Sequence, residues 1–338
     1  MSRVLIVAPN WIGDTLLAQP LCARLRATRP GIALDAVAPE WTAPVLARMP
    51  EIEEVIETPL AHGRVQLGAR LRLAGVLRAR RYDEAIVLPN TWKSALPPLL
   101  AGIPRRVGFV GEARYGLLNV RHRLDEAAAP LMAERYALLA APPGEPLPRP
   151  LAPPRLDVDE ANLAITIARL GLDRTRPVAA FCPGAEFGPS KRWPARHFAA
   201  LARALAERGR RVWLIGSPAD RAAGDEIAKL AHGAAINLCG RTDLAAAIDL
   251  LSVPEVVVSN DSGLMHVAAA LGRPLVALYG SSSPAHTPPL APARLVSLGI
   301  ECSPCFQREC PLGHFKCMND LLPERVLAEI REVDPALA

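Results

Sequence analysis

Aromatic side chains and long hydrophobic runs are scarce in this chain of 338 residues. Phe, Trp and Tyr make up 4% of it, although half of all residues are hydrophobic, mostly Ala and Leu. No apolar stretch approaches the roughly 18–20 residues that a membrane-spanning helix needs. The first residues, MSRVLIVAPNWIGD, turn polar too soon for a signal peptide and are typical of a first strand. We therefore expect a cytoplasmic protein with ample material for hydrophobic cores.

Several common nucleotide-binding and structural patterns are also missing. Seven cysteines in a chain of this length argue against a disulfide framework. The first turn contains no G-x-G-x-x-G, so a dinucleotide-binding turn is not expected there. The segment GAEFGPSK lacks the glycine spacing and the GK[ST] ending of a Walker loop, which excludes a P-loop NTPase.

The length predicts two domains, because one ordinary core does not grow this large. Residues 141–156, APPGEPLPRPLAPPRL, contain seven prolines and cannot form a helix or a central strand. We interpret them as a stiff, extended interdomain linker that holds two domains apart across a cleft. The predicted domains are 1–156, which includes the linker, and 157–338, which includes a cysteine-rich tail loop at 302–317.

Expected strands and helices alternate along the chain, strictly so in the second half. There the sequence predicts strands at 178–182, 211–215, 235–238, 255–259 and 275–278, and helices at 159–170, 196–208, 219–231, 243–251 and 264–271. In the first half it predicts strands at 3–8, 32–38, near 55, 85–88 and 106–109, and helices at 14–28, 69–80, 94–100 and 131–140. This alternation indicates an α/β fold of two Rossmann-like, doubly wound parallel sheets. Ligands of such sheets bind beyond the carboxyl ends of the strands.

The turn at 260–263 is the strongest candidate for a ligand site. Asn260, Asp261, Ser262 and Gly263 follow a β-branched strand and open a helix of small residues. Free N–H groups and a partial positive charge at such a helix start favour a phosphate. An ordinary capped turn without a ligand is the alternative reading. His266 lies further along this helix, where the helix terminus favours its neutral form, but a partly buried structural histidine would look the same.

Other turns of the second half carry compatible residues. Lys191 follows a loop that contains Gly184 and Gly188, and it is one of only four lysines in the chain; an ammonium there suits a departing diphosphate. Ser217 and Asp220 follow the next strand and could reach a ribose, and Thr242 and Asp243 open a later helix. Helix capping explains any one of these turns, but together they indicate a nucleotide-diphosphate site.

The first half offers a candidate base and an excess of positive charge. Gly13 permits a tight turn after the first strand, and Asp14 either caps the following helix or takes a proton from a substrate hydroxyl. Residues 64–123 contain eleven arginines and one lysine against three acids. Such a stretch suits nucleic acid, a phosphorylated lipid headgroup or an anionic sugar, unless its charges are simply solvated helix faces.

Four cysteines are clustered near the end as Cys302-x2-Cys305-x4-Cys310-x6-Cys317, with His314 between the last two. The number of thiols suits a tetrahedral zinc or an iron–sulfur cluster. Six residues separate Cys310 and Cys317, which is wider than the spacing in a tight zinc knuckle. A cysteine-rich loop without metal is therefore the other reading.

Taken together, PNWIGD, PGAEFGPSKRWP, NDSGLMH and ECSPCFQRECPLGHFKCM resemble the ADP-heptose:lipopolysaccharide heptosyltransferases (glycosyltransferase family 9). The resemblance covers nearly the whole chain, and the first and last motifs are most similar to the heptosyltransferase II type. It implies a GT-B fold, with the acceptor on the N-terminal domain and the nucleotide sugar on the C-terminal one. It also implies an inverting transfer of heptose to the first heptose of the inner core; heptosyltransferase I or III, or a related epimerase, is the alternative.

By the same resemblance, Asp14 is the catalytic base and Lys191 belongs to the diphosphate-binding K-x-W-P motif. The D-[ST]-G-x-x-H turn corresponds to Asp261, Ser262, Gly263 and His266. Where some relatives have Thr or Ser before the lysine, this chain has Glu186 and Phe187. The complete predicted donor site is Gly184, Ala185, Glu186, Lys191, Ser217, Asp220, Thr242, Asp261, Ser262, Gly263 and His266. The predicted acceptor residues are Asn10, Trp11, Gly13, Lys93, Arg105 and Arg106.

The resemblance implies no cofactor and no divalent metal, and no metal role is carried onto the cysteines. The implied partners are ADP-heptose, an anionic inner-core acceptor (Kdo2-lipid A carrying heptose) and the cytoplasmic face of the inner membrane of a Gram-negative bacterium. Nucleic acid is not expected, because surface aromatics do not interleave the Arg-rich stretch as single-strand binding requires.

Overall fold

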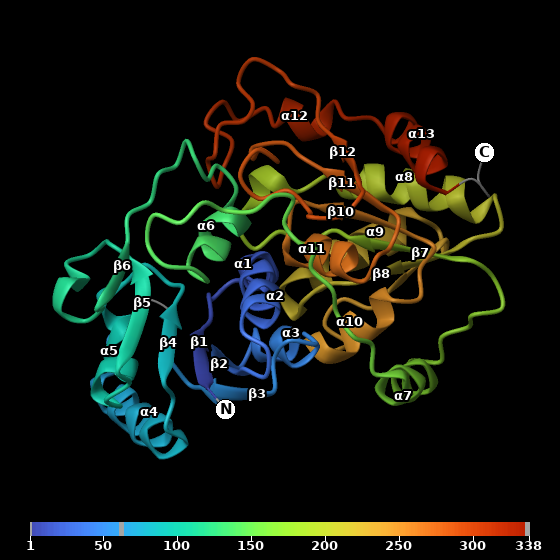
Figure 1. The fold of residues 1–338 in the computed structure, drawn as a ribbon. Coiled ribbons are helices and arrows are strands. Elements are labelled where there is room, and N and C mark those ends of the chain that lie inside the picture. The colour runs from blue at the N-terminus through green and yellow to red at the C-terminus, as the bar shows by residue number, and fades with distance from the viewer. Residues whose placement is uncertain (1, 61–63, 335–338) are drawn as a thin grey trace. The chain divides into compact units, whose positions relative to one another are not determined.

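The computed structural model describes residues 2–60 and 64–334. The chain divides into two compact units, Met1–Leu156 and Asp157–Ala338, which are coloured blue to green and green to red in Figure 1. In the described residues each unit contains one six-stranded parallel sheet with helices on both faces. The prediction of two Rossmann-like, doubly wound sheets is therefore confirmed.

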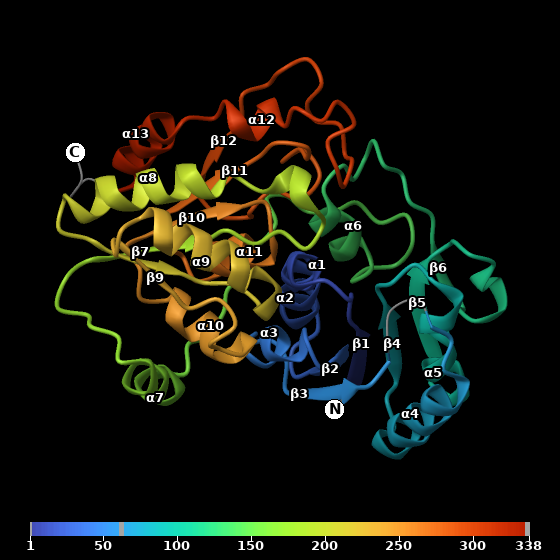
Figure 2. The ribbon, with the colours of Figure 1, turned by 180° about the vertical axis from the view of Figure 1, so that it is seen from behind.

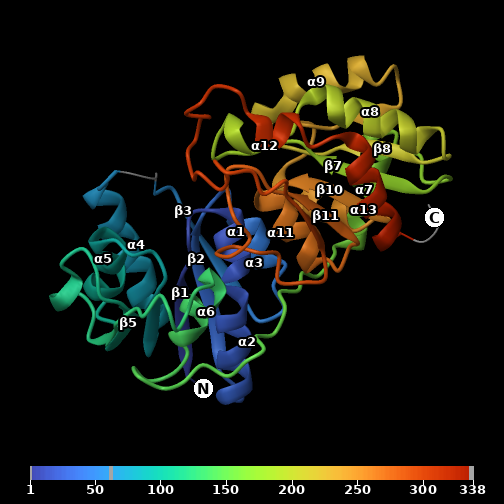
Figure 3. The same cartoon turned by 90° about the horizontal axis from the view of Figure 1, so that it is seen from above.

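The sheet of the N-terminal unit has the strand order β3-β2-β1-β4-β5-β6. Its strands are β1 (Arg3–Val7), β2 (Ala33–Pro39), β3 (Glu54–Thr58), β4 (Glu84–Val87), β5 (Arg105–Phe109) and β6 (Val120–His122). Its helices are α1 (Ile12–Leu17), α2 (Gln19–Thr28), α3 (Ala43–Ala47), α4 (Leu67–Arg80), α5 (Trp92–Leu100) and α6 (Met132–Leu138), with a short 3-10 turn at Arg114–Gly116. Figure 3 shows α4 and α5 on one face of this sheet and α1, α2 and α6 on the other.

The sheet of the C-terminal unit has the order β12-β11-β10-β7-β8-β9. Its strands are β7 (Val178–Cys182), β8 (Arg211–Leu214), β9 (Ala235–Asn237), β10 (Val256–Asn260), β11 (Leu275–Leu278) and β12 (Arg294–Val296). Its helices are α7 (Glu160–Leu170), α8 (Ala195–Ala206), α9 (Arg221–Leu230), α10 (Leu244–Leu251), α11 (Gly263–Ala270), α12 (Lys316–Asn319) and α13 (Pro323–Val333), with 3-10 turns at Pro189–Lys191 and Pro218–Asp220. Figure 2 shows α8 and α13 on one side of the sheet and α10 on the other.

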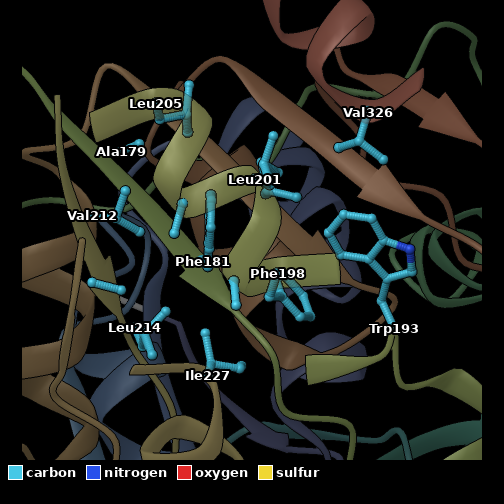
Figure 4. Packing of buried hydrophobic residues seen from close by; sticks show 14 of the residues in the cluster. Ala179, Phe181, Trp193, Phe198, Leu201, Leu205, Val212, Leu214, Ile227 and Val326 are labelled. Carbon is cyan, nitrogen blue, oxygen red and sulfur yellow. The ribbon is translucent and has the colours of Figure 1, made fainter. Parts of the chain in front are cut away.

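The core of the C-terminal unit fills the space between this sheet and helices α8, α9 and α13. Phe181, Phe198 and Leu201 are fully buried there, and Val326 of α13 completes the cluster (Figure 4). Trp193 packs edge-on against Phe198, with 4.8 Å between ring centroids, and its indole N–H donates to the carbonyl of Leu321 at 2.8 Å. The end of the Lys191 loop is therefore anchored in the core.

In both units the strand order reverses between two central neighbours. These are β1 and β4 in the N-terminal sheet, and β10 and β7 in the C-terminal sheet. Loops that leave such neighbours in opposite directions open a crevice at the carboxyl ends of the strands, which is where doubly wound sheets bind ligands. The sequence alone did not predict the positions of these two reversals.

The structure differs from the predicted elements at the first helix and adds several short elements. The expected helix at 14–28 is two helices, α1 and α2, which meet at Ala18. Pro20 has no N–H to continue the first helix and suits the first turn of the second. Helices α3, α12 and α13 and strands β6 and β12 were not predicted.

The proline-rich segment 141–156 contains no helix or strand, as predicted. It is fastened to its own unit, because the Gln19 side chain donates to the carbonyl of Arg155 at 2.7 Å and accepts its N–H at 2.8 Å. Within residues 2–60 and 64–334, no helix combines the length and the apolar character needed to cross a bilayer.

Candidate active site

An ion pair lies at the strand reversal of the C-terminal sheet. The Lys191 ammonium, in the loop after β7, is 2.6 Å from a carboxylate oxygen of Asp261, which directly follows β10. Both side chains are largely buried, with exposed fractions of 16% and 6%. The hydroxyl of Ser282 donates to the same carboxylate oxygen at 2.5 Å. The structure thus brings together two residues predicted for the donor site and adds Ser282, which the sequence analysis missed.

The buried side chain of Asn260 holds the two loops together. Its amide nitrogen donates to the carbonyl of Pro183 at 2.7 Å, and its oxygen accepts the N–H of Trp193 at 3.1 Å. Asn260 is completely buried, so these bonds satisfy groups that would otherwise be costly to bury. Through these two bonds, Asn260 at the end of β10 helps to position the loop that carries Lys191.

Helix α11 begins beside this ion pair. Ser262 is its N-cap residue in an extended conformation, but its side chain makes no capping hydrogen bond. The first N–H groups of an α-helix have no partner within the helix and carry a partial positive charge. With the Lys191 ammonium nearby, this helix start has the positive potential on which the prediction for Ser262 and Gly263 rests.

His266, one turn into α11, is buried. Its pKa is lowered to about 4, mainly by burial; the Asp261 carboxylate opposes this shift and the Lys191 charge adds to it. The ring is therefore neutral at neutral pH, as predicted. Desolvation is the main cause, whereas the sequence analysis attributed the neutral form to the helix terminus.

The glycine-containing loop before Lys191 is closely packed. A side chain at Gly184 would meet the Asp220 carboxylate at 2.4 Å, and one at Gly188 would meet the main-chain oxygen of Arg308 at 2.4 Å. Ala185 is buried, whereas Glu186 is exposed. The Lys191 ammonium also lies 4.9 Å from the ring centre of Phe187, a favourable cation–π contact.

The predicted ribose contacts show their capping role. The Asp220 carboxylate accepts the N–H of Ser217 at 2.9 Å and its hydroxyl at 2.7 Å, and Asp243 caps α10 through the N–H of Ala246. The Thr242 hydroxyl oxygen is buried and has no protein partner among the described residues. Thr242 therefore has unused hydrogen-bonding capacity, whereas Ser217 and Asp220 bond each other.

The cysteine-rich tail loop packs on the loop of Lys191, which the sequence analysis did not predict. The Ser190 hydroxyl donates to the carbonyl of Gln307 at 2.5 Å, and the Ser190 N–H donates to the carbonyl of Arg308 at 3.2 Å. The Ser303 hydroxyl donates to the carbonyl of Gly280 at 2.5 Å. This loop therefore supports both Lys191 and the segment after β11 that carries Ser282.

The four thiols of the tail loop are free and partly exposed. Main-chain N–H groups, foremost that of Phe315 at 3.4 Å, lower the pKa of the Cys310 thiol, whereas burial raises the pKa of Cys317. Among the described residues, no group of three or more His, Cys, Asp or Glu side chains is arranged to hold a metal ion.

Asp14 lies in the N-terminal unit, in the first turn of α1. The N-cap of this helix is Trp11, so the reading of Asp14 as an N-cap is wrong. Burial raises the pKa of Tyr136, and the nearby Asp14 carboxylate adds to this shift.

A pocket of about 220 Å³ opens at the strand reversal of the N-terminal sheet. It is lined by residues at and beyond the carboxyl ends of β1, β2, β3 and β4, including the predicted Asn10 and Lys93 together with Thr58, Arg70 and Thr91. Arg105 and Arg106 begin β5 and therefore lie at the amino ends of the strands, away from the pocket. The structure therefore brings Asn10 and Lys93 together and leaves the two arginines apart from them.

Much of the positive charge of residues 64–123 serves internal contacts. Arg106 donates to the carbonyls of Ile103 and Leu117, Arg114 donates to the carbonyl of Pro89, and Arg105 pairs with Glu84. A count of charges in the sequence cannot reveal these bonds.

The stretch from 64 to 123 does expose aromatic rings, since Trp92 and Tyr115 are 40% and 61% exposed. The expectation that it lacks surface aromatics is therefore wrong.

Comparisons with known proteins agree with this arrangement. The family model described as "Glycosyltransferase family 9 (heptosyltransferase)" matches residues 70–316. The chain is 46% identical to lipopolysaccharide heptosyltransferase 2 of Escherichia coli K12 over 97% of each protein. It is 42% identical to lipooligosaccharide heptosyltransferase 2 of Haemophilus influenzae over 98% of this chain and 99% of the relative.

The solved structure of E. coli ADP-heptose lps heptosyltransferase II superimposes with a TM-score of 0.87 over 98% of each chain, at 45% identity. This match covers both units and supports the predicted GT-B architecture. The extent of the family match and the identity to full-length relatives lead to one conclusion: the chain belongs to glycosyltransferase family 9, the family of the heptosyltransferases.

Proposed function

We propose that this glycosyltransferase moves L-glycero-D-manno-heptose from ADP-heptose to the first heptose of the lipopolysaccharide inner core, with inversion at the anomeric carbon. The observation that carries the proposal is the Lys191 ammonium at the start of α11, on the ligand-binding edge of the C-terminal sheet. The names and full-length similarity of the relatives support a heptose as the transferred sugar and a lipopolysaccharide as the acceptor.

The donor diphosphate would lie between Lys191 and the free N–H groups at Ser262 and Gly263. Lys191 and the helix start would neutralise the negative charge that grows on ADP as it departs, which is the role of preorganised electrostatic groups in catalysis. Neutral His266 can give or accept a hydrogen bond to phosphate or sugar. Thr242, whose hydroxyl has no partner in the described part of the chain, is the proposed ribose contact. The predicted loop 184–186, Ser217 and Asp220 would complete the pocket for the nucleoside.

On the N-terminal unit, Asp14 would act as the general base. Its carboxylate would remove the proton from the attacking hydroxyl as the anomeric carbon becomes oxocarbenium-like, and attack opposite to ADP gives inversion. Asn10, Trp11, Gly13 and Lys93 are the proposed acceptor contacts, since Asn10 and Lys93 line the pocket at the strand reversal. Arg105 and Arg106 lie at the other edge and are weaker candidates.

We also propose that the enzyme works at the cytoplasmic face of the inner membrane. Helix α4 supports this proposal, because Leu67, Leu71 and Val76 are 55%, 52% and 42% exposed on it. Its sequence, LGARLRLAGVLRAR, contains four arginines and no acid. A helix that exposes apolar and basic side chains together suits an anionic lipid surface. Sedimentation with anionic and with neutral vesicles tests this, and an L67E/L71E variant should lose binding to the anionic ones.

One assay tests the proposed reaction. Purified protein is incubated with ADP-heptose and with inner-core acceptors that carry no, one or two heptoses, and ADP release is measured. Release that requires the acceptor with one heptose supports the proposal. Preference for an acceptor without heptose, or with two, would assign heptosyltransferase I or III activity, and turnover of the donor alone would indicate an epimerase or a hydrolase.

A further inference from the structure

Three of the five tryptophans of this aromatic-poor chain are exposed. Trp11, Trp41 and Trp92 have exposed fractions of 48%, 46% and 40%, whereas Trp193 and Trp213 are buried. An indole contributes most to stability when its large surface is removed from water. Three half-exposed indoles in one unit contribute little to its core, so they point to a surface that receives a ligand.

All three follow strands at the ligand-binding edge of the N-terminal sheet, after β1, β2 and β4. Each adjoins the pocket in sequence: Trp11 follows Asn10, Trp41 comes two residues after Pro39, and Trp92 separates Thr91 from Lys93. The indole N–H of Trp41 donates to the carbonyl of Asn10 at 2.8 Å. This bond fixes one indole against the loop that leads to Trp11 and Asp14.

The pocket beside these indoles has a largely apolar lining into which a few polar and positively charged side chains are set. Arg70, 5% exposed, donates to the carbonyls of Val65 at 2.6 Å and Lys93 at 2.7 Å, and it has no carboxylate partner among the described residues. The Thr58 hydroxyl is buried without a partner in the same described set. A buried cation without a counter-ion is costly, and an anionic group in the pocket would offset that cost.

We infer that Trp11, Trp41 and Trp92 form a stacking platform for the sugar rings of the acceptor, and that the pocket beside it takes a carboxylate or phosphate of that saccharide. This inference rests on the proposed function and names the surface that recognises the acceptor. One face of a pyranose ring presents C–H groups, which pack on the electron-rich face of an indole, while the hydroxyls of the sugar remain in water.

A lipid surface is the other ligand that attracts exposed tryptophans. The position of these three favours a saccharide, because they adjoin a pocket whose lining includes polar groups. These are the buried guanidinium of Arg70, the ammonium of Lys93 and the Thr58 hydroxyl, which has no partner among the described residues. Acyl chains would leave these polar groups unpaired. The Trp41 N–H is, in addition, already bonded to the main chain.

The test uses the full-length enzyme with a soluble inner-core oligosaccharide from which the lipid has been removed. Trp11→Ala, Trp41→Ala and Trp92→Ala should each raise the KM for the oligosaccharide about tenfold, as expected for the loss of one aromatic contact, while the KM for ADP-heptose stays unchanged. Trp11→Phe and Trp92→Phe should retain most of the affinity. Tyr115→Ala is the matched control, since Tyr115 is an exposed aromatic of the same unit that does not line the pocket.

Binding can also be followed without catalysis. The oligosaccharide alone should quench the tryptophan fluorescence of the wild type and of Tyr115→Ala, and quench each Trp→Ala variant less. Unchanged oligosaccharide affinity in all three Trp→Ala variants would overturn the inference. The same holds if these variants lose only vesicle binding, which would assign the indoles to a lipid surface. Absence of transfer in the wild type, with quenching intact, would instead contradict the proposed reaction and leave the platform supported.

Discussion

The Lys191 ammonium and the Asp261 carboxylate lie 2.6 Å apart, although 70 residues separate them in the chain. They meet because β7 and β10 are neighbours at the strand reversal of the C-terminal sheet. In the proposed function, a bound diphosphate would compete with Asp261 for the ammonium, and the ion pair would hold Lys191 in place while no donor is bound.

Replacing Lys191 by Ala should weaken both the fold and donor binding. Among the described residues, the Asp261 carboxylate, 6% exposed, would keep only the Ser282 hydroxyl as a side-chain partner, so the free energy of unfolding should fall by about 3 kcal/mol, the usual effect of breaking a buried ion pair. Denaturant unfolding and calorimetric titration with ADP measure the two effects. Lys229→Ala, at an exposed lysine of α9, is the control and should change neither. ADP affinity equal to that of the wild type would exclude Lys191 from the donor site.

The sequence predicted much of this fold because alternating strands and helices leave a strong pattern. It also identified Lys191 and Asp261 separately, since each follows a strand. It could not predict their pairing, because the strand order depends on tertiary packing. Pro20, which splits the first helix, and Pro323 with Glu324, which open α13, were overlooked local signals. The tail loop on Ser190 and the internal bonds of Arg106 and Arg114 involve contacts between distant segments, which no local pattern encodes.

The burial of His266 makes stability depend on pH in a defined window. Its pKa is lowered from 6.5 to about 4 in the folded protein. Between these values the unfolded chain binds a proton that the folded protein does not, so stability falls as the pH falls from 6.5 to 4. The shift corresponds to at most about 3 kcal/mol. The difference in unfolding free energy between wild type and His266→Gln should therefore shrink as the pH is lowered from 7 to 4. A difference that stays constant over this range would show that His266 does not titrate as a buried neutral group.

Replacing Asp14 by Asn should remove the general base while preserving the shape of the side chain. Transfer should fall by about 10²- to 10⁴-fold, the usual contribution of a positioned base. ADP affinity should remain nearly unchanged, since the proposed donor residues belong to the other unit. Single-turnover transfer and calorimetry with ADP separate the two effects. Asp157→Asn, at an exposed carboxylate, serves as the control. Retention of most of the activity in Asp14→Asn would show that the base is another group.

Transfer should proceed without a divalent metal. In the proposed mechanism the charge of the departing ADP is stabilised by Lys191 and the N–H groups at the start of α11. The initial rate should be the same in excess EDTA as in buffer containing Mg²⁺, with ADP release as the readout. A rate that falls in EDTA and returns on addition of Mg²⁺ would refute this part of the mechanism.

The contact between Gly188 and the tail loop provides a test of how Lys191 is supported. An added Cβ at Gly188 would lie 2.4 Å from the main-chain oxygen of Arg308, and main-chain atoms cannot move aside as a flexible side chain can. Gly188→Ala should therefore separate the two loops and destabilise the protein by about 1–3 kcal/mol, the usual cost of overpacking. Because Ser190 bonds the same tail segment, the separation should also displace Lys191 and weaken ADP binding. Gly116→Ala is the control, since a side chain at Gly116 meets nothing within 4 Å. If Gly188→Ala loses stability but binds ADP normally, the tail loop supports the fold of the unit and not the donor site.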